Sequence, residues 1–219
     1  SNKFYDVLAQ ATAVPERTKL RRKYYSILGK LLYQEEQFDF MQFMQPFDTK
    51  LRFLLNSMNT FQQNPANNVD ILLTVLVDLQ GLLSVATTSS QYIKFFEWFF
   101  FDYFESILLA GVDASFTSSL FYNEAITKQY PLLMYNTVKF LVQFTNSTYS
   151  RINFSNSSPN SILLFRAVSN MSKMIIPLIP NLPQKLFEST VPRVFAIFNN
   201  LLNGNFVPYG VLIYYNDPA

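Results

Sequence analysis

The stretch Arg151–Met174, RINFSNSSPNSILLFRAVSNMSKM, shows how this chain is built. Its first part, 153–160, consists largely of Ser and Asn, a composition that favours turns. Ser158 and Pro159 then form a helix start, because a Ser oxygen can cap the first N–H groups and Pro fits the first helical position. The residues that follow are apolar at spacings of three and four, which predicts a capped amphipathic helix. They are Ile162, Phe165, Ala167–Val168 and Met171.

The same helical pattern recurs along the rest of the chain. Gly81 falls inside one such pattern, and close packing against another helix would explain it. Pro192 falls inside the last pattern and should kink that helix. The segment Gly111–Ser119 is predicted to be a loop, and Val211–Tyr215 is too short to assign to strand or helix. Helices are predicted over Pro15–Tyr33, Phe47–Phe61, Val69–Ala86 with Asn68 as its cap, Ser89–Leu109, Leu120–Gln129, Pro131–Asn146, Ser158–Ile175 and Gln184–Asn203.

Short connections between these helices indicate that they pair. Each pair takes roughly 40–45 residues, the spacing of HEAT and armadillo repeats. A single pair cannot bury both of its apolar stripes, whereas stacked pairs bury them against each other. The predicted fold is therefore all-α, a right-handed superhelical stack of antiparallel helix pairs. Residues 1–219 would form one α-solenoid segment of about four to five pairs. A compact helical bundle is the alternative.

Composition supports a segment taken from a longer solenoid. Apolar residues make up 49% of the chain and charged residues only 15%, where roughly a quarter is usual for charged residues. Such a segment would expose apolar faces at both ends, and would self-associate or be only marginally soluble. The net charge of +2, without a basic run interleaved with aromatics, gives no indication of nucleic-acid binding.

The residues of common catalytic and metal sites are largely missing. The chain has no Cys and no His, which removes the usual thiolate, general base and metal ligand. Its five Gly form no phosphate-binding loop. Glu35, Glu36 and Asp39 are the densest carboxylate group, and a solvated turn explains them better than an acid–base or Mg²⁺ site. We therefore predict no enzymatic activity, cofactor or metal.

The chain is also expected to be soluble. The most lipid-like window, Phe95–Val112, carries Glu97, Asp102 and Glu105. Three carboxylates in so short a span argue against a membrane-spanning helix. Residues 1–10 lack the apolar stretch of a secretory signal.

Several strings resemble one known family. SSPNSILLFRAVSNM, which begins at Ser157, resembles the SSPNGILLFRETSKM signature of the exportin-7 family, Ran-binding export receptors of the importin-β superfamily. RRKYYSILGKLL at Arg21–Leu32 is similar to the family's RRRYYTALGRLL. FMQFMQP, VDLQGLLSV at Val77–Val85 and FFEWF at Phe95–Phe99 also have counterparts, all in the same order. Ser161 stands where the family has Gly.

This resemblance implies a carrier function. A receptor of this family would be a HEAT-like solenoid that binds protein cargo together with GTP-loaded Ran. It would cross the pore past nucleoporins, shuttle between nucleus and cytoplasm, and release cargo when Ran hydrolyses GTP. The present chain would be a central segment of such a receptor. The alternative is a helical scaffold for other partners, with no role in transport.

Candidate partner-binding residues are basic. Arg21, Arg22 and Lys23 form the densest basic group, either a solvated rim or an electrostatic contact with an acidic partner. On that helix Leu20 and Tyr24 would face the core. Arg166, between apolar neighbours, would bridge to a neighbouring helix or point into a concave binding surface. The aromatic block Tyr92, Phe95–Phe96 and Trp98–Phe101 is expected to fill the interior rather than form a peptide pocket.

Overall fold

The structure is a computed structural model that describes residues 14–57, 65–103, 124–152 and 175–202. Within these ranges every regular element is helical, so the all-α prediction is confirmed. The elements are α2 (Val14–Tyr33), α3 (Phe40–Ser57), α4 (Pro65–Val85), α5 (Ser89–Phe99), α6 (Glu124–Gln129), α7 (Pro131–Arg151), the 3₁₀-helix η4 (Ile176–Asn181) and α9 (Gln184–Leu202).

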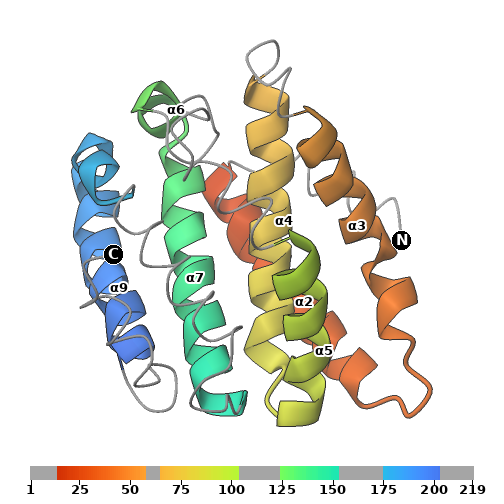
Figure 1. The fold of residues 1–219 in the computed structure, drawn as a ribbon. Coiled ribbons are helices and arrows are strands. Elements are labelled where there is room, and N and C mark those ends of the chain that lie inside the picture. The colour runs from red at the N-terminus through yellow and green to blue at the C-terminus, as the bar shows by residue number, and fades with distance from the viewer. Residues whose placement is uncertain (1–13, 58–64, 104–123, 153–174, 203–219) are drawn as a thin grey trace, which may run out of the picture.

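The long helices run in two opposite directions. Helices α2, α4, α7 and α9 run the same way, and Figure 1 shows α4, α7 and α9 side by side in a row. Helix α2 packs on α4, α4 on α7, and α7 on α9. Helices α3 and α5 run in the opposite direction (Figure 1), with α3 packed on α4 and α5 on α7. The result is the predicted solenoid-like stack, in which antiparallel pairs repeat along a row.

Two helix starts differ from the prediction. Helix α3 begins at Phe40, not at Phe47, because Asp39 caps it: the Asp39 Oδ1 atom accepts from the Gln42 N–H at 3.0 Å. Helix α4 begins at Pro65, a residue suited to a first turn, whereas the predicted cap Asn68 lies buried within the helix.

The bounds of the other predicted helices agree with the structure to different degrees. Helices α2 and α9 match their predictions, and α9 contains Pro192 as expected. Helix α5 is capped by Thr88, whose hydroxyl accepts from the Gln91 N–H. The described part of the predicted helix Leu120–Gln129 is helical, as α6 (Glu124–Gln129), and α7 continues to Arg151, beyond its predicted end. Outside the described residues lie the predicted loop Gly111–Ser119, most of the helix Ser158–Ile175, and Val211–Tyr215.

Two glycines allow α2 and α4 to approach closely. A Cβ on Gly81 would overlap the carbonyl oxygen of Arg22 and lie 2.8 Å from the Tyr25 Cβ atom. A Cβ on Gly29 would lie 2.6 Å from the Val85 Cγ2 atom. Close helix packing, predicted for Gly81, is therefore confirmed.

The predicted core face of α2 is only partly right: Tyr24 packs against the core, whereas Leu20 does not. Leu20 is 44% exposed, and Ile27 and Leu31 are also exposed. The side of α2 that is buried carries Arg21 and Tyr25 instead. The reason is that Arg21 finds a buried carboxylate on α4, and Gly29 and Gly81 let this polar side come close.

Aromatic side chains fill the core between α5 and α7, as predicted. Phe95 and Phe99 are fully buried, and Phe99 meets Phe140 and Phe144 edge-on at centroid distances of 5.0 Å and 5.4 Å. The exception in the aromatic block is Phe101, which is 59% exposed.

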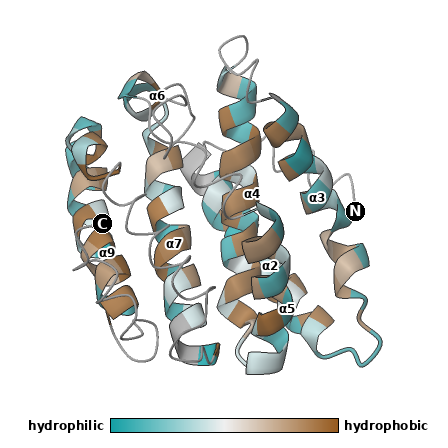
Figure 2. Cartoon of the chain, viewed as in Figure 1, coloured by the Kyte–Doolittle hydropathy of each residue, from teal (hydrophilic) through white to brown (hydrophobic). Residues whose placement is uncertain are grey.

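Helix α4 is long and apolar enough to cross a membrane, and it is the one such helix among the described residues. However, 78% of its most apolar window is buried inside the fold. Figure 2 shows hydrophobic residues over much of α4, which lies between α2 and α7. This is the pattern of a central core helix.

Substituting each glycine by Ala should distinguish a new methyl group that meets backbone atoms, at Gly81, from one that meets a side chain, at Gly29. Ala is normally the better helix residue, but at Gly81 its methyl group meets backbone atoms that cannot move aside. We expect Gly81→Ala to lower the free energy of unfolding by about 2 kcal/mol. Gly29→Ala meets the end of a side chain that can rotate, so its cost should be clearly smaller. Urea unfolding measures both; a Gly81→Ala variant as stable as the wild type would contradict the close contact.

Candidate functional site

The contact between α2 and α4 buries an ion pair. Arg21 Nε donates to Asp78 Oδ1 at 2.9 Å, and Arg21 Nη2 donates to Asp78 Oδ2 at 2.7 Å. The Asp78 side chain has no exposed surface and that of Arg21 is 10% exposed. Burial raises the pKa of Asp78 to about 6, and the hydrogen bonds from Arg21 and the charge of Lys50 oppose this rise. At neutral pH the pair is thus ionised and holds the two helices together.

The neighbouring residue Arg22 joins three helices through neutral partners. Its Nε donates to Gln80 Oε1 on α4 at 2.9 Å, and its Nη2 donates to Asn136 Oδ1 on α7 at 3.1 Å. Gln80 Nε2 in turn donates to the Asn136 carbonyl oxygen at 3.2 Å. Burial lowers the pKa of Arg22, a shift that Tyr135 opposes. Arg22 is therefore positioned firmly but is not neutralised by these contacts.

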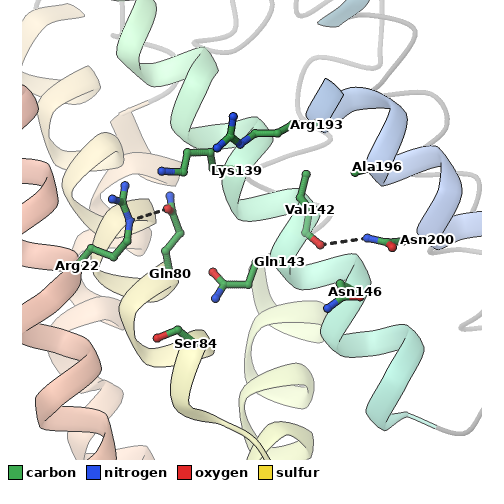
Figure 3. Close-up of a pocket in the computed structure, with 10 residues that line it drawn as sticks. All are labelled: Arg22, Gln80, Ser84, Lys139, Val142, Gln143, Asn146, Arg193, Ala196 and Asn200. Carbon is green, nitrogen blue, oxygen red and sulfur yellow. Dashed lines mark hydrogen bonds between the residues drawn. The ribbon is translucent and has the colours of Figure 1, made fainter. Parts of the chain in front are cut away.

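A cleft of about 550 Å³ lies next to this network, between α2, α4, α7 and α9. Figure 3 shows three basic side chains across one end of it, each from a different helix. They are Arg22 from α2, Lys139 from α7 and Arg193 from α9. The wall between α7 and α9 is closed by Asn200, whose Nδ2 donates to the Val142 carbonyl oxygen at 3.2 Å (Figure 3).

Tyr135 organises two of these cations. The Lys139 ammonium lies 5.2 Å from the centroid of the Tyr135 ring, and the Arg193 guanidinium lies 5.5 Å from it. Burial tends to raise the pKa of Tyr135, but a hydrogen bond from Ser189 and the nearby cations lower it overall. The pKa of Lys139 is also lowered, by burial first and then by the charge of Arg22. These shifts reflect positive charges gathered in a partly desolvated space.

Among the described residues, the cations of the cleft have no acidic partner. In the part of the chain that the structure describes, the ion pairs are Arg17–Asp70, Arg21–Asp78 and Lys128–Glu124. None of these involves Arg22, Lys139 or Arg193. The same described residues hold no group of three or more His, Cys, Asp or Glu side chains suited to a metal. The chemistry of the cleft therefore suits an anionic group.

The predicted site residues have different surroundings. Arg21 is buried against Asp78, Arg22 lines the cleft, and Lys23 is exposed on α2. Arg166 lies outside the described residues. Glu35 and Glu36 are exposed in the turn before α3.

Sequence reasoning missed Lys139 and Arg193. Each is a single cation within a mostly apolar stretch, KFLV on α7 and PRVF on α9. A single cation within an apolar helical stretch is a sequence signal for a candidate site residue. Neither cation can be placed beside Arg22 from the sequence alone, because their helices are far apart in the chain.

Curated proteins similar to the chain are named either exportin-7 or Ran-binding protein. Exportin-7 of Dictyostelium discoideum is 27% identical over 206 residues, which cover 91% of this chain. The chain resembles exportin-7 over nearly its whole length. Exportin-7-B of Xenopus laevis is 27% identical over 211 residues, and Ran-binding protein 17 of mouse is 26% identical over 210 residues. No family model and no solved structure matches the chain.

The predicted resemblance to exportin-7 is thereby confirmed. The chain spans 18–19% of the length of these relatives. Three of the exportin-7-like strings fall on elements of the core: Arg21–Leu32 on α2, Val77–Val85 on α4, and Phe95–Phe99 on α5. The strings on α2 and α4 contain both members of the buried ion pair and both close-packed glycines. Their physical role is packing.

Substituting Asp78 and substituting Arg21 should lower the free energy of unfolding by different amounts. Asp78→Asn leaves a buried guanidinium that cannot lose its proton, and we expect it to lower the free energy of unfolding by about 3–5 kcal/mol at any pH from 6 to 8. Arg21→Met leaves a carboxylate that can take up a proton. Without Arg21 to oppose burial, the pKa of Asp78 should rise above its wild-type value of about 6.

The folded Arg21→Met variant then keeps a proton that its unfolded chain releases, so its stability increases as the pH falls. Its deficit relative to wild type should shrink from pH 8 to pH 6. The double variant Arg21→Met/Asp78→Leu, which removes both charges, serves as the control and should lose little stability. Urea unfolding over this pH range measures all three. Equal, pH-independent deficits for both single variants would show that the charges do not pair in the fold.

Proposed function

We propose that this chain is a segment of a nuclear transport receptor of the exportin-7 type. The whole receptor would bind protein cargo together with GTP-loaded Ran, pass nucleoporins and shuttle between nucleus and cytoplasm. The observation that carries this proposal is the collinear similarity to proteins named exportin-7 and Ran-binding protein, over 91–92% of the chain. The stacked helix pairs are consistent with such a receptor.

Exposed apolar faces at both ends of the row support the proposal that the chain is one segment of a longer solenoid. On α2, Ile27 and Leu31 are 53% and 59% exposed. On α9, Phe195 is 71% exposed, and it borders an apolar hollow of about 270 Å³ shared with Phe187 and Phe198. We propose that neighbouring helix pairs of the longer protein cover these faces, as stacked repeats cover one another.

In such a receptor, Ran and cargo would be coupled through the shape of the solenoid. If each of them binds one curvature better, each raises the affinity of the receptor for the other, and this coupling is reciprocal. Stacked repeats suit the mechanism, since each repeat contacts only its neighbours and small rotations add along the row.

Nucleotide-dependent Ran binding tests the transport proposal. The endogenous full-length protein would be captured with an antibody against this chain and incubated with Ran locked in its GTP form or loaded with GDP. We expect retention of the GTP form and little of the GDP form, which acts as the internal control. If both forms of Ran are retained equally, or if neither form is retained, the proposal is contradicted. A helical scaffold without a role in transport would then be favoured.

Self-association tests the proposed end faces. We expect the chain to associate with increasing concentration in light scattering, because apolar end faces meet each other when their natural neighbours are missing. Phe195→Glu, which places a charge on the α9 end, should reduce this association. Ile93→Glu changes a 43% exposed residue on α5, away from both end helices, and is the matched control. Equal effects of the two substitutions would contradict a specific end face.

A further inference from the structure

We propose that the cleft between α2, α4, α7 and α9 binds an acidic segment of a partner protein. Arg22, Lys139 and Arg193 would contact Asp and Glu side chains of that segment. This inference does not depend on the transport function, because it rests on the chemistry of the cleft alone.

The first argument is the balance of charge. Each of the three cations contacts neutral groups: Arg22 bonds Gln80 and Asn136, Arg193 bonds the Ser189 carbonyl and hydroxyl oxygens, and Lys139 lies over Tyr135. Half-buried cations that repel one another raise the free energy of the cleft when it is empty. A ligand that brings several carboxylates relieves this repulsion and forms charge-assisted hydrogen bonds.

The second argument is the spacing and origin of the cations. They come from three helices and face a common space of about 550 Å³ (Figure 3). A single small anion would reach only part of such a space, whereas a peptide can lay successive side chains along it. Arg guanidinium groups also match the geometry of carboxylates, which they bind with two parallel hydrogen bonds.

The third argument separates carboxylates from phosphates. Phosphate sites commonly use backbone N–H groups at a helix N-terminus or in a Gly-rich loop. Here all three cations lie well inside their helices, where backbone N–H groups are used by the helix, and no Gly lines the cleft. Val142 and Ala196 add apolar surface suited to the methylene groups of Glu. An acidic peptide segment therefore fits better than a nucleotide.

Fluorescence anisotropy with a labelled peptide tests this inference on the intact chain. The probe alternates Glu-Glu with Ser-Gly, and a second peptide with Gln in place of Glu is the neutral control. We expect the acidic peptide to bind, more weakly as salt is added, and the Gln peptide not to bind. Inorganic phosphate should compete poorly.

Variants then locate the binding site. The double variant Lys139→Gln/Arg193→Gln should weaken binding about tenfold or more. Lys139→Arg/Arg193→Lys, which keeps both charges, should retain most of the affinity. Lys185→Gln removes an exposed cation from α9 outside the cleft, and we expect less than about a twofold effect because exposed single charges contribute little. Circular dichroism confirms that each variant is folded.

Three results would overturn the inference. One is that the acidic and Gln peptides bind equally well, or that neither peptide binds. Another is a folded double variant that binds as tightly as the wild type. The third is effective competition by inorganic phosphate, which would point to a phosphate site. Should the double variant fail to fold, the single variants Lys139→Gln and Arg193→Gln give the same comparison, and an unchanged affinity in both would count against the cleft.

Discussion

The packing of α2 on α4 is the constraint on which the rest of the structure depends. Two glycines let the helices approach closely, and the Arg21–Asp78 pair sits within the contact. Because both charges are buried and each satisfies the other, this contact fixes which side of α2 turns inward. Arg22, the next residue, is thereby directed toward α7, and the cleft forms beside it.

Two kinds of interface result from the alternating helix directions. Antiparallel α5 and α7 meet through buried aromatic rings, such as Phe96 stacked on Phe144. The parallel helices α4, α7 and α9 are joined partly by polar contacts, for example Gln80 with Asn136 and Asn200 with Thr145. Polar side chains therefore gather where the parallel helices adjoin. The aromatic contacts fill the interior between α5 and α7, whereas the polar contacts between the parallel helices leave groups that can meet a ligand.

The resemblance to exportin-7 and the cleft concern mostly different residues. The similar strings on α2, α4 and α5 include the close-packed glycines, the buried pair and the aromatic core. Arg22 belongs to one of these strings, but Lys139 and Arg193 belong to none. These strings describe how the helices pack, whereas the charge of the cleft is assembled across helices that the strings do not connect.

The sequence by itself determined the helices, because apolar spacing, Pro and Gly act locally. It predicted α2 and α9 closely and placed the aromatic residues of α5 in the interior, since large rings at helical spacing have few other favourable positions. It also explained Gly81 by close packing. It placed the starts of α3 and α4 too late, because Asp39 caps α3, Pro46 is tolerated within that helix, and Pro65 opens α4.

Only the tertiary structure decided which face of α2 is buried and which cations share a cleft. Hydropathy alone assigns Leu20 to the core and Arg21 to solvent, and the reverse holds because Asp78 pairs with Arg21 across α4. Arg22, Lys139 and Arg193 come together because the parallel helices α2, α4, α7 and α9 pack on one another in succession, a relation between distant parts of the chain. Local sequence fixes a residue's position on its own helix, but the energy of a buried charge depends on the partner that another helix supplies.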